Sequence, residues 1–198
     1  MRYSQNHKEQ THARLVRTAA SRFRGNGTEG LSIGDLMAEL GLTHGGFYRH
    51  FDSKEQLFAE AFAFAFEERG ELIVHAVSNA KAGFELRTMI EKYLSLEHCA
   101  HSAEGCPAAA LAAEVARHPL PVRFRYETAM VAYGSRFVKF LPGPTKEQRR
   151  KNVLVLFSGM AGALTMARAV ADPELRRTIL ASAREFYIAA FCNSSRDE

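Results

Sequence analysis

The chain lacks tryptophan, has only three cysteines and carries a formal net charge of only +4 over its 198 residues. Fourteen phenylalanines supply large apolar side chains, so the sequence can still bury a sizeable core. A small, odd number of cysteines without framework spacing argues against a disulfide scaffold and indicates a reducing cytosol. The small net charge excludes a chain that is polycationic over its whole length.

Long uncharged apolar runs are also scarce. The longest, residues 153–167, is shorter than the roughly 20 residues that span a bilayer, and serine and glycine interrupt it. We interpret this run as a buried helix of a soluble protein. The N-terminal segment MRYSQNHKEQ is polar and has no apolar signal region. The sequence therefore predicts a cytoplasmic protein with no membrane partner.

No stretch shows the alternating pattern of a strand, and every segment fits a helix. Apolar spacing and capping residues predict two short helices within residues 32–51, and longer helices over about 8–23, 54–77, 84–98, 107–117, 122–140, 146–170 and 173–191. We expect an all-α fold of about nine helices. Residues 1–53 would form a three-helix head with a helix-turn-helix, and residues 54–198 a C-terminal bundle for effector binding and dimerisation.

The most informative stretch is residues 32–54. Ser32 can cap a first helix, with Asp35 three residues on, and Gly41 can end it because glycine adopts left-handed backbone angles without steric cost. Thr43 can then cap a second helix. Two short helices joined by a tight turn are typical of a helix-turn-helix, whose second helix can lie in the major groove of DNA.

The segment before this motif is basic. Residues 1–24 have a local net charge of +5, with Glu9 as the one acidic residue. Its basic residues are Arg2, Lys8, Arg14, Arg17, Arg22 and Arg24. A basic segment beside a helix-turn-helix suits a phosphate backbone, and a merely solvated basic face is the alternative.

The motif resembles the TetR family of bacterial repressors. The matching positions are Gly27, Ser32, Ile33, Leu36, Gly41, Leu42, Thr43, Gly46, Phe47, Tyr48, His50, Phe51, Lys54 and Leu57. The pattern covers about residues 10–58, and its Y-x-H-F-x-x-K ending is absent from a generic helix-turn-helix. The resemblance implies a homodimer that binds a palindromic double-stranded DNA operator and is released by a small molecule in the C-terminal domain. The position after Gly27, usually aromatic in the family, is Thr28 here.

We expect the DNA contacts to come from the second helix of the motif and its flanks. Its first turn would present side chains to base edges, and its two glycines would permit close approach of the backbone. The resemblance implies that Tyr48, His50 and Lys54 donate to phosphates; ordinary half-buried packing is the alternative for the first two. Arg49 would read a guanine or face solvent. The candidate DNA-binding residues are Ser32, Thr43, His44, Gly45, Gly46, Tyr48, Arg49, His50 and Lys54.

Aromatic and methionine side chains of the C-terminal half suggest an apolar effector pocket, although each taken singly can equally be core. The candidates are Phe62, Phe66, Met89, Tyr93, His98, Cys106, Phe124 and Met160. Cys106 begins a predicted helix, where a thiol pKa falls, and its surroundings resemble those of electrophile-sensing members of the family. We expect an apolar or electrophilic effector; an unreactive buried cysteine is the alternative.

The predicted helices over about 146–170 and 173–191 would form the dimer face. The first is apolar nearly all round, so it needs cover on more than one side; a central helix of a monomer core is the alternative.

Two further features have residue types that an enzyme or a metal site would need. Residues 25–30 match G-x-G-x-x-G by letter, but a helix precedes them where the dinucleotide motif needs a strand. The group His98, Cys99, His101 and Cys106 has ligand residue types, yet Cys99 would point away from the histidines. We expect no enzyme, no cofactor and no metal. The alternative is an all-helical cytosolic enzyme that uses residues 98–106.

Overall fold

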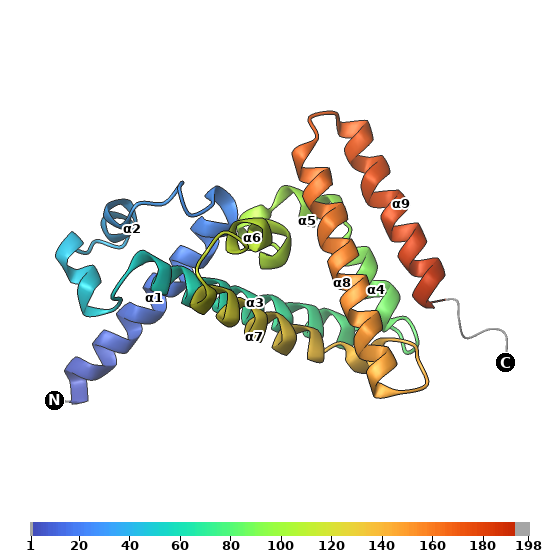
Figure 1. Cartoon of the computed structure of the whole chain (residues 1–198), viewed down its shortest axis with the longest axis horizontal. Helices are drawn as coiled ribbons and strands as arrows, with labels where there is room; N and C mark the ends of the chain where they lie inside the picture. The colour runs from blue at the N-terminus through green and yellow to red at the C-terminus, as the bar shows by residue number, and fades with distance from the viewer. Residues whose placement is uncertain (1, 193–198) are drawn as a thin grey trace.

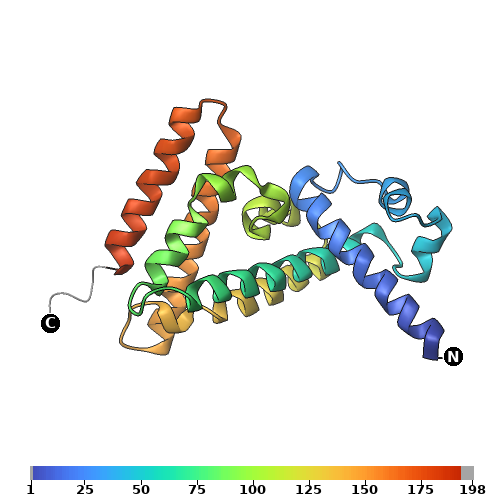
Figure 2. The same ribbon diagram turned by 180° about the vertical axis from the view of Figure 1, so that it is seen from behind.

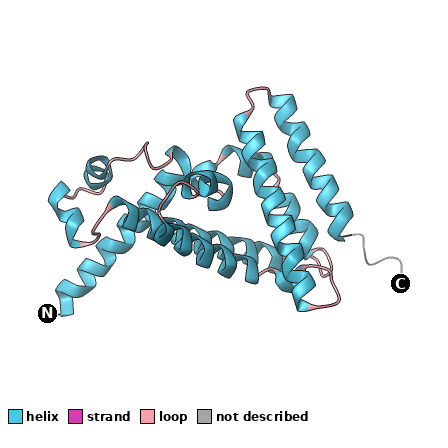
Figure 3. Cartoon of the chain, in the orientation of Figure 1, coloured by secondary structure: helices cyan, strands magenta, loops and turns pink. Residues whose placement is uncertain are grey.

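The computed structural model describes residues 2–192, and within this range all regular structure is helical (Figure 3). The α-helices are α1 (Arg2–Asn26), α2 (Ile33–Glu39), α3 (Lys54–Ser78), α4 (Glu85–Tyr93), α5 (Leu96–Ala100), α6 (Pro107–Val115), α7 (Leu120–Ser135), α8 (Lys146–Ala169) and α9 (Pro173–Cys192). Three short 3-10 helices join them: η1 (His44–Arg49), η2 (Ser102–Glu104) and η3 (Val138–Phe140). The predicted all-α class is confirmed.

The molecule is elongated, with a small head at one end and a helical hairpin at the other (Figure 1). The head consists of α1, α2 and η1, and the hairpin consists of α8 and α9. Helix α3 runs from the head toward the hairpin with α7 alongside it, and α6 lies between the head and α8 (Figures 1 and 2). The two ends are therefore connected through α3, α6 and α7, and also through η2, which packs against α1.

The helix-turn-helix forms by the predicted local interactions, with one difference. Ser32 Oγ accepts a hydrogen bond from the Asp35 amide at 3.0 Å, and Gly41 has a φ of 70°. The second helix of the motif is a 3-10 helix, and Thr43 makes no side-chain cap to it. Its two adjacent glycines explain the difference, because glycine has a low helix propensity.

Other helix boundaries depart from the sequence expectations at three places. Helix α1, expected over about 8–23, is longer at both ends and spans Arg2–Asn26. The helix expected over residues 84–98 divides into α4 and α5, because Ser95 Oγ accepts from the His98 amide at 3.0 Å and starts a new helix. The helix expected over residues 122–140 ends at Ser135, and η3 follows. The predicted start of α8 is correct: Thr145 Oγ1 accepts from the Gln148 amide at 3.1 Å.

Two apolar clusters share α3. Leu57, Phe58 and Phe62 of α3 pack with the buried face of α1 and with Phe47, while Phe66, Ile73 and Val77 belong to a cluster with α4, α7, α8 and α9. The head cluster also takes in Leu111 and Val115 from α6. The first core therefore extends past residue 53, where we expected the head to end.

Helix α8 is long and apolar enough to cross a membrane by length and composition alone, but only 28% of its most apolar window is buried. Its inner face packs in the second cluster, and a Cβ atom at Gly159 would overlap the Tyr187 hydroxyl of α9. Its outer face is open in the single chain, where Leu154 and Val155 are each 57% exposed and Met166 is 60% exposed. The chain itself therefore covers one side of this helix only, and the alternative of a central helix of a monomer core does not fit.

Candidate functional site

A groove of about 670 Å³ lies between the N-terminal half of α1 and the helix-turn-helix. Its lining residues are His7, Lys8, Thr11, Met37, Gly41, Leu42, Thr43, Gly46, Arg49 and His50. Four of them are candidate DNA-binding residues. The three lining residues from α1 were not among the candidates from the sequence. The basic composition of residues 1–24 indicated this segment but did not single out these three.

The tips of the candidate DNA-binding side chains in and beside η1 face outward. Thr43, His44 and Arg49 are exposed, and Tyr48 is 60% exposed. They are held by Phe47, which is fully buried and meets the Tyr48 ring edge-on at a centroid distance of 5.3 Å. The buried Phe47 thus fixes η1 in the head, while the neighbouring polar side chains are exposed.

His50 is a half-buried residue in the lining of the groove. Its Nδ1 is buried and has no hydrogen-bond partner among the described residues. Burial, and then the positive charges of His12, Lys8 and Arg49, lower the pKa of His50. The ring therefore stays neutral at neutral pH and offers a hydrogen bond rather than a charge.

Two of the candidate DNA-binding residues are also bonded within the chain. The Ser32 hydroxyl donates to Asp35 Oδ2 at 2.6 Å in addition to its capping bond. Lys54 Nζ donates to the Thr28 carbonyl oxygen at 2.5 Å. An ammonium group has three donors, so Lys54 keeps two for another acceptor while it is fixed in place.

Thr28 links the head to α6. Its amide donates to Glu114 Oε1 at 2.8 Å, and its hydroxyl donates to the same oxygen. The residue is 8% exposed. A polar contact between the head and α6 therefore occupies the position where the family usually has an aromatic residue.

The basic residues of α1 do not form one surface. Arg24 is 5% exposed, and its guanidinium donates to the Gly105 carbonyl at 3.2 Å and to Glu68 Oε2 at 3.1 Å. Arg22 pairs with Glu39 at 3.0 Å. The interpretation of the whole segment as a phosphate-binding face is wrong for Arg24, which fastens the head to the residue before Cys106.

A cavity of about 860 Å³ lies in the C-terminal part, among α3, α4, α6, α7 and α8. Its lining residues are Phe66, Tyr93, Cys106, Ala108, Ala109, Ala110, Ala112, Ala113, Tyr126, Met130, Tyr133, Gly134, Val153, Leu154, Val155, Phe157, Ser158, Ala161, Gly162, Thr165 and Met166. A mostly apolar pocket of this size is typical of small-molecule sites. Three candidate effector residues, Phe66, Tyr93 and Cys106, are among them.

The other five candidate effector residues do not line this cavity. Phe62, Met89 and Met160 are at most 1% exposed and belong to the two apolar clusters, where their inward spacing on the helices places them. Phe124 is 61% exposed on the outer side of α7, and His98 faces a different, polar pocket.

Most of the lining residues were not candidates from the sequence, and Tyr133 and Phe157 are the large aromatic ones whose rings pack together there. Tyr133 continues the helical spacing of Tyr126 and Met130 along α7, so this periodicity was the available signal.

Two hydroxyl groups in the cavity wall lack a hydrogen-bond partner among the described residues. They belong to Tyr93 and Tyr133, which are 1% and 4% exposed. Burial is the main cause that raises the pKa of each of these phenols well above its usual value. Both groups are therefore neutral donors over the whole physiological pH range.

His98 holds the loop that carries Cys106. Its Nδ1 lies 2.7 Å from the Tyr93 carbonyl oxygen, so it carries the proton, and Nε2 accepts from the Cys106 amide at 3.0 Å. Burial, then the charges of Arg69 and Arg168, lower the pKa of His98 to about 3. Because both ring nitrogens are used, His98 cannot serve as a metal ligand, and no group of three metal-ligating side chains occurs among the described residues.

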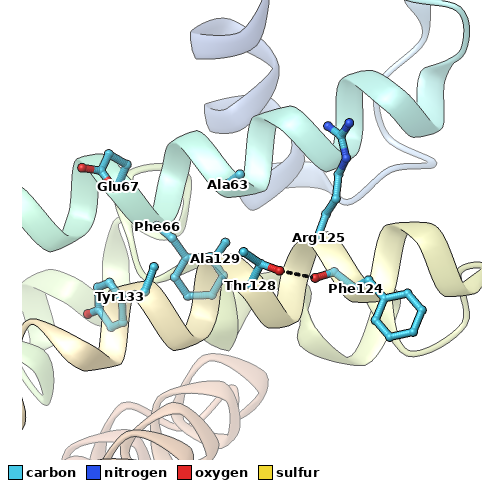
Figure 4. A pocket seen from close by; sticks show the side chains of 9 residues that line it. Ala63, Phe66, Glu67, Phe124, Arg125, Thr128, Ala129 and Tyr133 are labelled. Carbon is cyan, nitrogen blue, oxygen red and sulfur yellow. Dashed lines mark hydrogen bonds between the residues drawn. The ribbon is translucent and has the colours of Figure 1, made fainter.

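A second, shallower groove of about 450 Å³ lies between α3 and α7 (Figure 4). Figure 4 shows Phe66 and Tyr133 between the two helices and Phe124 toward the outside. Thr128 Oγ1 donates to the Phe124 carbonyl at 2.9 Å, so this hydroxyl is already used. Phe66 and Tyr133 line both this groove and the cavity, and therefore form the wall between them.

Comparison with known proteins identifies the head. Residues 15–61 match the family model of bacterial regulatory proteins of the tetR family. No curated protein matches the chain.

Several solved structures share the whole architecture. A TetR-family regulator from Chloroflexus aurantiacus J-10-FL is 25% identical, with a TM-score of 0.70 and coverage of 93% of this chain and 96% of that one. One from Cytophaga hutchinsonii is 19% identical, with a TM-score of 0.73 and the same coverage. The regulator FadR from Bacillus subtilis, in complex with stearoyl-CoA, is 16% identical, with a TM-score of 0.66 and coverage of 89% and 97%.

Proposed function

The chain belongs to the TetR family of bacterial regulatory proteins, and we propose that it binds a palindromic operator as a homodimer and releases it when a small molecule occupies the cavity. It is a DNA-binding regulator and not an enzyme. The observation that carries the proposal is the row of exposed polar groups at η1 beside the groove with Lys8 and Arg49. The proposed regulation is repression, with the protein acting in the cytoplasm.

In this proposal the two sides of the groove have different tasks. Thr43, His44 and Arg49 are exposed at the start and end of η1 and would read base edges, while the exposed Gly45 lets the backbone approach. Tyr48, His50 and Lys54 would bind phosphates, together with Lys8 of α1. Phosphate contacts set affinity and base contacts set sequence preference.

The proposed dimer face is the outer side of α8 together with α9. Leu154, Val155 and Met166 expose apolar surface there, although they also border the cavity, and Phe186 of α9 is 65% exposed. A Cβ atom at Gly162 would meet nothing within 4 Å in the single chain, so its small size leaves room for a second helix. A two-fold dimer would also place two heads on a palindrome.

The proposed route from cavity to head is α6. Five alanines of this helix and Cys106 at its start line the cavity. Both ends of the helix also touch the head: the Gly105 carbonyl accepts from Arg24, and Glu114 accepts from Thr28. A ligand that moves α6 would strain these contacts and shift the head away from its DNA-binding position.

The small molecule of this proposal could also be an electrophile that reacts covalently with a cysteine of the cavity. Cys106 lines the cavity at the start of α6, although it is only 1% exposed. Treatment of the operator complex with N-ethylmaleimide should release DNA if this thiol is the sensor. Release of the Cys106→Ser variant at the same dose would exclude the site, since Cys99 and Cys192 are also free thiols.

The experiment that tests the proposal is selection of bound fragments from genomic DNA of the source organism, followed by binding measurements on the enriched fragment. We expect one palindromic sequence, bound by a dimer at least about 1,000-fold more tightly than random DNA at physiological salt. Equal affinity for all fragments would contradict the proposal. The matched control is a Thr43→Ala, His44→Ala, Arg49→Ala triple variant, which should retain only weak, salt-dependent binding.

A further inference from the structure

The hydroxyl groups in the wall of the cavity fall into two kinds. Ser158 Oγ donates to the Leu154 carbonyl at 2.7 Å, and Thr165 Oγ1 donates to the Ala109 carbonyl at 2.9 Å. The hydroxyls of Tyr93 and Tyr133 have no such acceptor among the described residues. A fifth hydroxyl of the wall belongs to Tyr126, which is only half-buried. Tyr93 and Tyr133 therefore carry the two fully buried hydroxyls without a partner, and these are left for something that enters the cavity.

An unpaired buried hydroxyl is costly, so each of these two groups needs an acceptor from solvent or from a bound molecule. The two side chains come from different helices, α4 and α7, and both meet the ring of Phe157, at centroid distances of 6.1 and 5.2 Å. Both tyrosine rings therefore pack against the same aromatic side chain, and Tyr133 lies close enough to Tyr93 to contribute to the raised pKa of that residue. An oxygen with two lone pairs can accept from both.

The charge of the wall restricts the ligand further. No Lys, Arg, His, Asp or Glu is among the described residues that line the cavity. The nearby Arg168 is held outside it, with Nε on the Cys99 carbonyl at 3.2 Å and Nη2 on the His98 carbonyl at 2.8 Å. An ionic ligand would lose its hydration and find no counter-charge in the wall, which is unfavourable.

From these observations we propose that the cavity selects a neutral, mainly apolar molecule with a carbonyl-type oxygen, and that Tyr93 and Tyr133 bind this oxygen. The inference rests on the proposed effector role of the cavity and adds the ligand class. The two tyrosines are specificity-determining residues: they distinguish a ligand with an acceptor from a hydrocarbon of the same shape.

Calorimetric titration with four naphthalenes of similar size tests the proposal. The probes are 2-acetylnaphthalene as the neutral ketone, 2-isopropenylnaphthalene as its shape match without the oxygen, 2-naphthoate as the anion, and trimethyl(2-naphthyl)ammonium as the cation. The proteins are the wild type, Tyr93→Phe, Tyr133→Phe and the double variant. Tyr187→Phe is the matched control, because this tyrosine packs on α8 and does not line the cavity.

We expect the wild type to bind the ketone most tightly. Each cavity substitution should weaken ketone binding by about 3- to 10-fold, the usual effect of one neutral hydrogen bond, and leave the isopropenyl compound unchanged. The double variant should bind the two compounds equally. The melting temperature of each ligand-free cavity variant should rise, because an unpaired buried hydroxyl is removed; a merely structural tyrosine would show a fall.

Three results would overturn the inference: equal affinity of the wild type for ketone and isopropenyl compound, tighter binding of either ion, or a ketone preference that survives in the double variant. Unchanged binding of the isopropenyl compound shows that the variants are folded. Failure of all four probes to bind would also overturn the ligand class. The proposed DNA-binding function is tested separately, by the selection of bound DNA fragments.

Discussion

The groove at the head and the cavity of the C-terminal part differ in how they are built. The groove is lined by residues 7–50, which come from three consecutive helices, and four of its polar residues, His7, Lys8, Thr43 and Arg49, are exposed. The cavity is lined by residues 66–166, from five helices; it has no charged side chain among the described residues, and its unpaired hydroxyls, those of Tyr93 and Tyr133, are buried and neutral. The first suits a large charged partner from outside, and the second suits a small uncharged one. Helix α6 touches both regions, so substitutions around it test the comparison most severely.

The largest expected effect is that of Arg24→Ala. The guanidinium is almost fully buried and joins α1 to the Gly105 carbonyl and to Glu68. Its loss should lower the free energy of unfolding by about 3 kcal/mol, at the low end for a buried pair because Glu68 is partly solvated. Urea denaturation measures this. Arg14→Ala, an exposed residue of the same helix, should change stability by less than about 0.5 kcal/mol; an equal loss in both variants would show that Arg24 is no special link.

The next effect is a pH dependence from His98. Its pKa is about 3 in the folded protein and 6.5 ordinarily, so the unfolded chain binds the extra proton first. This group's contribution to stability is complete above pH 6.5 and is lost as the pH falls toward 3. At pH 5 the loss should be about 2 kcal/mol.

The His98→Gln variant should be less stable than the wild type at pH 7 and should lose less stability on acidification. His101→Gln, at an exposed histidine three residues after His98 that does not line the cavity, should keep the wild-type profile; a flat wild-type profile would refute the assignment.

A smaller effect is expected at the other end of α6. Glu114→Ala removes the acceptor of the Thr28 amide and hydroxyl, and should lower stability by about 1 kcal/mol, the usual contribution of such bonds. It should also reduce the ability of a cavity ligand to change operator affinity. Glu127→Ala on the exposed side of α7 is the control. Full ligand sensitivity in Glu114→Ala would remove this contact from the proposed route.

The smallest expected effect is that of Lys54→Ala. One phosphate contact fewer should weaken binding to all DNA sequences alike and reduce the slope of log affinity against log salt by about 0.9. Lys146→Ala, at the exposed start of α8, should leave the slope unchanged. Equal slopes for wild type and Lys54→Ala would mean that Lys54 only fastens the Thr28 carbonyl.

Sequence reasoning recovered the head because its signals are local. The Ser32 cap and the left-handed Gly41 act within a few residues, and both are present in the structure. The 3-10 form of η1 was missed, although its two glycines argue against a regular α-helix. Arg24 was misassigned for a different reason: its buried partner, the Gly105 carbonyl, lies 81 residues further along the chain.

The cavity was only partly predictable, because helical spacing identifies an inward face without telling core from cavity. Met89 and Met160 have that spacing and are core, whereas Tyr93 has it and lines the cavity. The distinction depends on how α6 and α7 pack against α8, and no pattern within one helix encodes it. The small alanines of α6 create the space, yet in the sequence they read as ordinary helix formers.

The central claim is that occupation of the cavity and binding of the operator are coupled through α6. The most direct measurement is the operator affinity with and without saturating 2-acetylnaphthalene, paired with the affinity for this ketone with and without operator. The account predicts that each ligand weakens the other by the same factor, as thermodynamic linkage requires, and that the factor shrinks in Glu114→Ala. Unchanged operator affinity while the ketone occupies the cavity would contradict it.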